Sequence, residues 1–374
     1  MTQSLPRQAP AVGPPAGDHP ALASRVRDAV LNTAAGVTVR AIPRIPNRLK
    51  RLLLGGRSVT VDGNTLDTTL QLMLAAERIS GTGKLVASDD VAVARSQLRI
   101  LSGQLEVDID VSTTDLSIPG PAAPLSARHY RAADSGSPLL VYFHGGGWVL
   151  GDIETHDGLC RLTCRDAGVH VLSVDYRRPP EHKAPAAVDD AFAAYRWALD
   201  NGAELGADPN RVAVGGDSAG GNLAALVCHR ARNEGVRSPA LQMLLYPITN
   251  LCGDTRSRTL FAEGYWLTKQ NMDWFADHYL AGTRLDAADP RLSPLLADDL
   301  SSLPPALILT AGFDPLRDEG NAYAEAMRAA GVTVDLREFG SLIHSFAPFF
   351  PLGGGSATAT TEMISALRAH LTHG

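Results

Sequence analysis

A serine between glycines is the residue of this chain that is best placed for nucleophilic chemistry. The pattern G-x-S-x-G is met by Gly216-Asp217-Ser218-Ala219-Gly220, with a strand-like run before it and a helix-like run after it. A strand that turns sharply into a helix holds such a serine hydroxyl out at the top of a sheet. Glycines two residues before and after the serine relieve the crowding of that turn. We therefore expect Ser218 to be a nucleophile rather than an incidental serine of a glycine-rich turn.

A run of glycines after another strand-like segment is the second chemical signal. It reads His144-Gly145-Gly146-Gly147. Attack on an acyl carbonyl builds negative charge on its oxygen, and rigid N–H donors aimed at that oxygen stabilise it. Glycines let backbone N–H groups turn toward the site, and the N–H of Ala219, directly after the nucleophile, points there as well. A phosphate-binding loop is the alternative, but the chain has no G-x-x-x-x-G-K-[ST] motif, and no G-x-G-x-x-G opens a helix here.

A serine hydroxyl needs a base, and the base needs an acid that orients it. Asp314 follows the apolar run 305–312, and His344 follows the run 332–339. The order Ser218, Asp314, His344 is the chain order of the triad in α/β-hydrolases. We therefore expect these three residues to form a catalytic triad at one edge of the sheet.

Rival acids and bases stand in less suitable places. Asp318 and Glu319 fall inside the start of a predicted helix, and Asp314 itself has the alternative role of a helix N-cap. Six other histidines are expected in a strand (His129), on helices or their approaches (His156, His182, His229) and at a C-terminus expected to fray (His370, His373). Only His344 combines the order along the chain with a position at a strand end.

Short apolar runs that alternate with helix-length segments must position these residues. Eight strand-like runs follow from residue 105 onward, and most are rich in Val, Ile or Leu, as strands covered on both faces tend to be. They predict an α/β fold with a mostly parallel sheet of about eight strands and helices on both faces. The runs are 106–118, 125–133, 138–148, 169–176, 211–217, 240–247, 305–312 and 332–339. Helices are expected at 155–167, 186–199, 221–232 and 318–330.

The first hundred residues are expected to be all-helical. Residues 1–20 are rich in Pro, Ala and Gly and predict a flexible tail. Helical patterning follows near Leu22, Val26 and Val30 and at 47–54, 66–80 and 88–102. A further aromatic helical pattern at 264–280 lies in a long gap between two strands, and we expect it on the side of the sheet that holds the site.

Composition excludes several classes of function. The chain has 374 residues and a net charge of −6, which disfavours nucleic-acid binding. No apolar run approaches the ~20 residues that cross a bilayer, and the first residues lack the apolar core of a signal peptide, so we expect a cytoplasmic protein. Four cysteines are too few for a disulfide scaffold. Cys160 and Cys164 lack two further ligands at zinc spacing, so buried thiols are expected there.

These motifs together resemble a known family. The segments YFHGGGW, DYRRPPEH, GGDSAGGN and DPLRDEG and the His344 loop occur in the order found in the bacterial hormone-sensitive-lipase-like carboxylesterases of the α/β-hydrolase superfamily. The resemblance runs from about Leu105 to the C-terminus, and the long N-terminal part looks like an actinobacterial or mycobacterial subgroup with an extended cap. Two departures stand out. Arg178-Pro179 replaces the usual Leu-Ala, and Ser345 stands where the family usually has Gly.

The resemblance implies the roles of the site residues. The triad would be Ser218, Asp314 and His344, and the oxyanion hole would use Gly146, Gly147 and the Ala219 amide. His144, Gly145, Gly216, Asp217 and Gly220 would support these motifs. A helical cap would cover the site. The implied organisation is a tail (1–20), an N-terminal cap segment (21–104), a first catalytic part (105–248), a cap insertion (249–290) and a second catalytic part (291–374).

We therefore expect a metal-free serine carboxylesterase that needs no cofactor and hydrolyses short- to medium-chain acyl esters through an acyl-enzyme. A lipase acting at a lipid interface and an amidase are alternatives with the same machinery. A non-catalytic receptor on this fold is the rival from another class. The resemblance also makes a homodimer plausible, through an edge strand such as 332–339.

Two softer features leave alternatives open. The basic helix 47–54 could lie on a lipid surface, but we expect Leu52 and Leu53 to pack inward. The aromatic residues Trp148, Trp266, Trp274, Phe275 and Tyr279 either line an acyl pocket or simply pack.

Overall fold

The computed structural model describes residues 41–81 and 84–372. The expected tail 1–20 and the helix expected near Leu22, Val26 and Val30 lie outside these residues. Within the described ranges, no helix combines the length and the apolar composition needed to cross a membrane.

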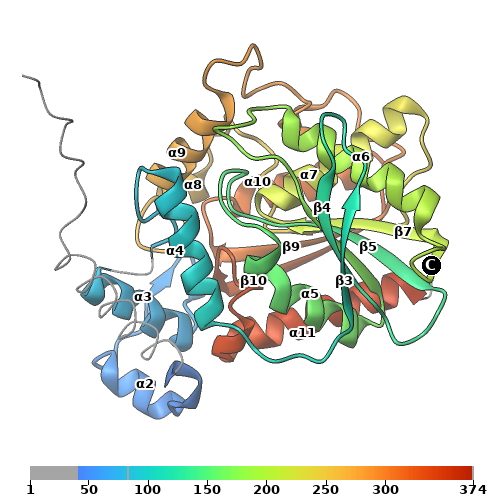
Figure 1. Cartoon of the computed structure of the whole chain (residues 1–374). Helices are drawn as coiled ribbons and strands as arrows, with labels where there is room; N and C mark the ends of the chain where they lie inside the picture. Colours follow the sequence, from blue (N-terminus) through green and yellow to red (C-terminus); the bar gives the residue numbers. More distant parts are fainter. Residues whose placement is uncertain (1–40, 82–83, 373–374) are drawn as a thin grey trace, which may run out of the picture.

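An eight-stranded sheet forms the centre of the molecule (Figure 1). The strand order is β10-β9-β8-β7-β5-β6-β4-β3, and all neighbours pair in parallel except β3 with β4 and β4 with β6. The prediction of an α/β fold with a mostly parallel sheet is confirmed. The strands are β3 (Thr113–Ile118), β4 (Leu125–Tyr130), β5 (Ser137–Phe143), β6 (His170–Asp175), β7 (Ala207–Asp217), β8 (Gln242–Leu245), β9 (Ala306–Phe313) and β10 (Val334–Ile343).

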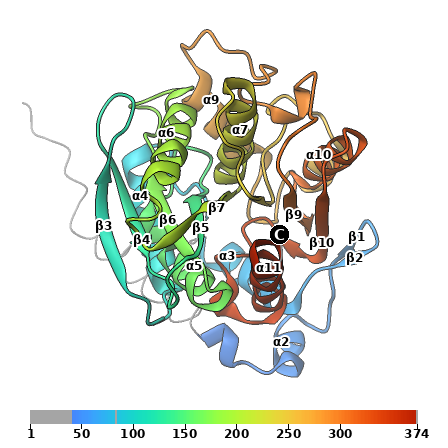
Figure 2. The same ribbon diagram turned by 90° about the vertical axis from the view of Figure 1, so that its right-hand side faces the viewer.

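Helices cover both faces of this sheet (Figure 2). One face packs against α5 (Ile153–Ala167) and α11 (Gly354–Thr372). The other face packs against α6 (Ala186–Asn201), α7 (Ala219–Glu234) and α10 (Arg317–Ala329). The four helices predicted in this part are confirmed. α11 was not predicted: the C-terminus, expected to fray, is a helix whose apolar side is buried in the core.

The first strand is shorter than its sequence pattern suggests. The apolar run begins at residue 106, but β3 begins only at Thr113. The strand expectation for 106–112 is therefore wrong. The carbonyl oxygens of Ile109 and Val111 accept hydrogen bonds from the Arg161 guanidinium, at 3.4 and 2.9 Å, instead of from a neighbouring strand.

Three of the predicted N-terminal helices are present. They are α2 (Asn47–Leu53), α3 (Thr68–Ser80) and α4 (Val91–Gln104). Asp67 and Asp90 accept hydrogen bonds from the first N–H groups of α3 and α4, as N-cap residues do. The segment is not all-helical, however. A hairpin of β1 (Thr60–Val61) and β2 (Asn64–Thr65) turns at Asp62-Gly63, where both residues have positive φ.

The orientation of α2 contradicts the expectation for its leucines. Leu52 is 72% exposed and Leu53 is 60% exposed. The buried side chain of this helix is Lys50, whose ammonium donates to the Thr69 hydroxyl on α3 at 2.9 Å. This hydrogen bond places the lysine side of α2 against α3, and the two leucines face outward.

The insertion between β8 and β9 carries two helices, α8 (Arg256–Leu260) and α9 (Lys269–Leu280). The second helix confirms the helical pattern within 264–280. In Figure 1, α8 and α9 lie on the same side of the sheet as the N-terminal elements drawn in blue to teal.

Candidate active site

The turn between β7 and α7 holds Ser218. The strand ends at Asp217 and the helix begins at Ala219, so that Ser218 alone makes the turn, with φ 56° and ψ −115°. Such a left-handed backbone is strained for a residue with a side chain. A Cβ on Gly216 would lie 2.5 Å from the carbonyl oxygen of Gly220. The flanking glycines are therefore required by space, as the sequence pattern indicates.

The structure brings the three expected triad residues together. His344 Nε2 lies 2.9 Å from Ser218 Oγ, and His344 Nδ1 lies 2.7 Å from Asp314 Oδ2. Asp314 follows the last residue of β9, and His344 follows the last residue of β10. Ser218 is 6% exposed, His344 2% and Asp314 0%, so the carboxylate faces the imidazole in a site shielded from water.

Asp314 and His344 are each held in place by a further contact. The second oxygen of Asp314 accepts a hydrogen bond from the Leu316 N–H at 2.8 Å, which holds the carboxylate in place before α10. The ring of Tyr246 packs edge-on against His344, with 4.9 Å between ring centroids. Asp318 and Glu319 lie in the first turn of α10, as expected from the sequence. Glu319 instead pairs with Arg258 of the insertion at 2.7 Å.

The glycine run forms a loop beside Ser218. Gly146 and Gly147 have φ of 112° and 59°, and both line a cavity that also contains Ser218. The carbonyl of Gly146 accepts from the Leu150 N–H at 2.8 Å, which closes the loop into a tight turn. Ala219 opens α7, and a helix N-terminus favours negative charge. Gly146, Gly147 and the first residue of α7 thus lie beside Ser218.

Asp217 ties this loop to the serine turn. Its Oδ1 accepts hydrogen bonds from the Tyr142 hydroxyl at 2.7 Å and from the Gly145 N–H at 2.9 Å, and it lies 3.2 Å from Nε2 of His156. Burial acts to raise the pKa of Asp217, but His156 and the hydrogen bond from Tyr142 together lower that pKa below its usual value. Burial opposes the charged form of His156 too, yet the attraction of Asp217 raises the pKa of this histidine.

His144 supports the same loop without reaching the serine. Its ring stacks on Tyr176, with 4.2 Å between centroids, and the Tyr176 hydroxyl donates to the His144 carbonyl at 2.8 Å. Burial lowers the pKa of His144 to about 3, so this ring is neutral at physiological pH. Its place at the head of the glycine run is therefore structural.

Sequence reasoning missed the contribution of α4 to this loop. Arg95 donates to the carbonyl of Val149 at 2.8 Å and to the carbonyl of Pro179 at 2.7 Å, and it also binds both carboxylate oxygens of Glu181. Tyr142 and His156 were missed as partners of Asp217. Arg95, Tyr142 and His156 each contact a residue more than fifty positions away along the chain, so no local motif predicts these contacts.

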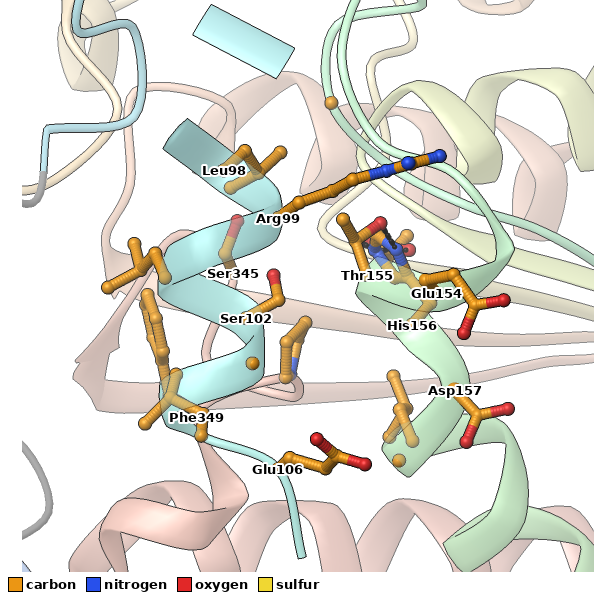
Figure 3. A pocket seen from close by; sticks show the side chains of 18 of the residues that line it. Leu98, Arg99, Ser102, Glu106, Glu154, Thr155, His156, Asp157, Ser345 and Phe349 are labelled. Atoms are coloured by element: carbon orange, nitrogen blue, oxygen red, sulfur yellow. Dashed lines mark hydrogen bonds and ion pairs between the residues drawn. The ribbon is translucent and has the colours of Figure 1, made fainter. Parts of the chain in front are cut away.

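Two cavities open at the site. The larger, of about 510 Å³, contains Ser218 and His344 and is walled mainly by apolar side chains of the insertion and its surroundings, among them Leu251, Leu267, Met272 and Phe275. The smaller, of about 220 Å³, lies between α4 and α5 (Figure 3).

Some of the five aromatic residues named in the sequence analysis line a cavity, and others only pack against neighbouring rings. Phe275 and Trp148 line the larger cavity, and Trp266 lines the smaller one. Tyr279 instead stacks on Trp148 at 4.3 Å, and Trp274 packs against His278 at 4.4 Å.

The cysteines are free thiols. Cys160 and Cys164 are buried, as expected from the sequence, and burial raises the pKa of both, that of Cys164 to about 12. Within the described residues, no three His, Cys, Asp or Glu side chains gather as metal ligands would.

Comparison with known proteins gives one consistent result. A family model described as alpha/beta hydrolase fold matches residues 140–348. The chain is 56% identical to the carboxylic ester hydrolase LipN of Mycobacterium tuberculosis, over 100% of both chains. It is 39% identical to the carboxylesterase NlhH of the same organism, covering 83% of this chain and 98% of that one. The solved structure of the ester-hydrolase EH1AB1 from the metagenome of Lake Arreo, complexed with a bipyridine phosphonate derivative, matches with a TM-score of 0.76. Its sequence identity is 43%, and the match covers 80% of this chain and 96% of that chain.

Proposed function

This chain belongs to the alpha/beta-hydrolase family, in its hormone-sensitive-lipase-like branch, and is a carboxylic ester hydrolase; on that premise we propose that Ser218, His344 and Asp314 carry out the hydrolysis. The hydrogen-bonded chain from Ser218 through His344 to the buried Asp314 carries this proposal.

The proposed reaction runs in two halves. Ser218 Oγ attacks the ester carbonyl while His344 Nε2 takes its proton, and a tetrahedral intermediate forms. The N–H groups of Gly146, Gly147 and Ala219 stabilise the oxyanion. When the intermediate collapses, the bond to the alcohol oxygen breaks and His344 returns the proton to the leaving alcohol. Water then attacks the acyl-enzyme with the same help from His344, which releases the acid and restores Ser218.

Asp314 has an orienting role in this scheme. Its Oδ2 accepts the hydrogen bond from His344 Nδ1, so that Nε2 is left as the acceptor that faces Ser218. The same carboxylate stabilises the imidazolium that forms in each half of the reaction.

Hydrolysis of p-nitrophenyl esters from acetate to palmitate, by the wild type and by Ser218→Ala, tests the proposal. We expect the variant to lose nearly all turnover, about 10⁶-fold as in comparable triad enzymes. Circular dichroism and a melting curve establish that the variant is folded. A folded Ser218→Ala protein with wild-type turnover would refute the role of the serine.

Short- to medium-chain acyl esters are the proposed substrates. The cavity at Ser218 is lined by more apolar than polar groups and, at about 510 Å³, is modest in size. The ester series therefore should peak at short or medium chains. A steep preference for emulsified long-chain triglycerides would favour a lipase instead, and turnover of acetanilides at comparable rates would favour an amidase.

We further propose that the N-terminal elements (21–104) and the insertion (249–290) together form a cap over the catalytic parts (105–248 and 291–374). Leu85 from the first segment and Phe275 from the second both line the cavity at Ser218, which supports this division.

The proposed compartment is the cytoplasm, and free thiols at all four cysteines suit a reducing environment. A homodimer is proposed through β10, which lies at the edge of the sheet. Sedimentation velocity on the full chain tests the dimer: a monomer at micromolar concentration would contradict it.

A further inference from the structure

Helix α2 turns three leucines to the outside of the molecule. Leu52 and Leu53 are mostly exposed, and Leu49 is 45% exposed. At positions i, i+3 and i+4 of one helix, these side chains lie together on one face. Single apolar residues are scattered over any protein surface, but a contiguous group of exposed leucines marks a surface that binds a partner.

The opposite side of α2 holds the helix against the rest of the protein. Lys50 is buried, and its ammonium donates to the Thr69 hydroxyl of α3. The next helix, α3, buries Leu70, Met73 and Leu74 in the apolar core. In both views of the molecule, α2 lies at its edge, beyond α3 (Figure 1 and Figure 2). The leucine face is therefore carried on a fixed support and directed away from the core.

Basic residues surround the leucines. The stretch 41–61 has no Asp or Glu, although the chain as a whole has a net charge of −6, and its basic residues are Arg44, Arg48, Lys50, Arg51 and Arg57. All four arginines are exposed. No acidic side chain among the described residues forms an ion pair with Arg48, Arg51 or Arg57. The positive charge of these three side chains is thus available to a partner.

The combination of leucines and arginines selects the class of partner. Helices that lie on a bilayer place apolar side chains at the boundary of headgroups and acyl chains, and basic side chains beside them attract anionic lipids. A nucleic acid would use the arginines but leave the leucines in water. A second copy of this chain, bound through the same face, would bring two positive stretches together, and like charges oppose such contact.

We propose that α2 docks the protein on an anionic lipid bilayer. Its three leucines lie among the headgroups, and Arg48, Arg51 and Arg57 bind the lipid phosphates around them. The cytoplasmic leaflet of a membrane carries the negative surface potential that this requires, which agrees with the proposed compartment. Because α2 lies on the same side of the sheet as α8 and α9, docking turns the insertion toward the bilayer (Figure 1). The inference does not depend on the proposed ester hydrolysis.

Flotation of the full chain with lipid vesicles tests the proposal. One set of vesicles is pure phosphatidylcholine, and the other is an equimolar mixture of phosphatidylcholine and phosphatidylglycerol. At low salt we expect the wild type to float with the anionic vesicles and to remain in solution with the neutral ones. Salt at about 0.5 M should weaken the binding, because it screens the arginines from the lipid phosphates.

Leucine and arginine variants separate the two contributions. Leu52→Ala should weaken binding to the anionic vesicles about fivefold, because it removes apolar surface that only the bilayer covers. Arg48→Gln combined with Arg51→Gln should weaken it about 25-fold, which corresponds to roughly fivefold for each charge at the membrane surface. The doubly substituted protein should also lose most of the salt dependence.

Matched controls lie elsewhere on the surface. Leu296→Ala removes a leucine that is 38% exposed in the segment before β9. Arg196→Gln combined with Arg237→Gln removes two exposed arginines, one on α6 and one after α7. Both controls should bind the anionic vesicles as the wild type does. Melting curves establish that every variant is folded.

A thiol introduced by Leu52→Cys shows whether the leucine face is open. In the full chain without lipid, this thiol should react with a water-soluble maleimide at the rate of an exposed cysteine. Anionic vesicles should slow the reaction strongly, and neutral vesicles should not. A slow reaction without lipid would show that another part of the chain or a second copy already covers the face, and it would overturn the proposal.

Three flotation or sedimentation results would also contradict the proposal. The wild type must float with anionic vesicles and must prefer them to neutral ones. Equal losses in the α2 arginine variant and in its control would assign the binding to the charge of the whole protein rather than to α2. A wild-type oligomer that dissociates in Leu52→Ala, without any binding to vesicles, would assign the leucine face to a second copy.

Discussion

The central sheet and two of the N-terminal helices, α2 and α4, differ in how much apolar surface they bury. All eight residues of β9 are buried, whereas α4 buries only Ala94 and α2 only Lys50. The third helix of this part, α3, buries Leu70, Met73 and Leu74 in the apolar core, and polar contacts add to the attachment of the other N-terminal elements. Arg95 binds the loop after the glycine run, and Asp62 binds Arg317 at 2.9 Å next to the proposed acid.

This difference matches the proposed division of work. The apolar sheet fixes Ser218, Asp314 and His344 at strand ends, where a shift of an ångström would break the hydrogen-bonded chain. The N-terminal helices cover the site and contribute to its cavities through Leu85 and Ser102. Changes in the sheet region should therefore remove activity or stability, and changes in the cover should adjust rate and selectivity.

Among changes that leave the serine in place, the largest expected effect is on the acid of the triad. Asp314→Asn keeps the size of the side chain but removes the charge and favours the wrong tautomer of His344. We expect kcat to fall about 10⁴-fold, the effect seen for this change in a triad protease. Steady-state kinetics on p-nitrophenyl butyrate measures it. The control is Asp318→Asn, in the first turn of α10. An equal loss of kcat in both variants would argue against a special role of Asp314.

A smaller loss is expected from the glycine run. A Cβ on Gly146 would lie 2.6 Å from the backbone carbonyl carbon of Leu150, and φ at this residue is 112°. Gly146→Ala must therefore move the loop, and we expect kcat to fall by about 10² to 10³, the usual cost of one oxyanion donor. KM should change little. Gly136→Ala, where the added methyl meets nothing within 4 Å, provides a matched glycine at positive φ.

Leucines of the sheet and of α2 should differ in how much they contribute to the free energy of unfolding. Leu309 on β9 is 0% exposed, and Leu309→Ala should lower the free energy of unfolding by about 2–5 kcal/mol. Leu52 on α2 is 72% exposed, and Leu52→Ala should change the free energy of unfolding by less than about 0.5 kcal/mol. Urea unfolding of both variants measures the contrast. A large loss in Leu52→Ala would show that α2 packs its leucines after all.

The smallest kinetic effect is expected where α4 contacts the loop that follows the glycine run. Arg95→Met keeps much of the stem but loses the hydrogen bonds to Val149 and Pro179. We expect kcat to fall about tenfold with KM little changed, the equivalent of one charge-assisted hydrogen bond. Glu181→Gln leaves both carbonyl contacts in place, and because Glu181 is 55% exposed its ion pair should contribute little. A larger effect from Glu181→Gln would assign the role to the ion pair.

Local sequence patterns predict the sheet region well. Strands buried on both faces must be continuous apolar runs, and the serine turn needs glycines at fixed offsets, so both leave a signature within a few residues. The positions of Asp314 and His344 follow from the strands that precede them. The fold and the three hydrogen-bonded side chains were therefore accessible from the sequence.

The N-terminal part was harder to predict because its contacts are long-range. The Asp62-Gly63 turn was a usable hairpin signal that the helical pattern around it concealed. The inward Lys50 depends on the Thr69 hydroxyl of another helix, which α2 does not reveal. The pairing of Asp217 with His156 and the contact of Arg95 with Val149 are also set only by the folded chain.

Covalent trapping tests the central claim most directly. A p-nitrophenyl alkylphosphonate mimics the tetrahedral intermediate and transfers its phosphonyl group to an activated serine, releasing p-nitrophenol. We predict one equivalent of p-nitrophenol per chain, a single modified peptide with the label on Ser218, and loss of esterase activity in step with labelling. An enzyme that keeps full esterase activity without a label, or that is inactivated by a label on another residue, would contradict the account.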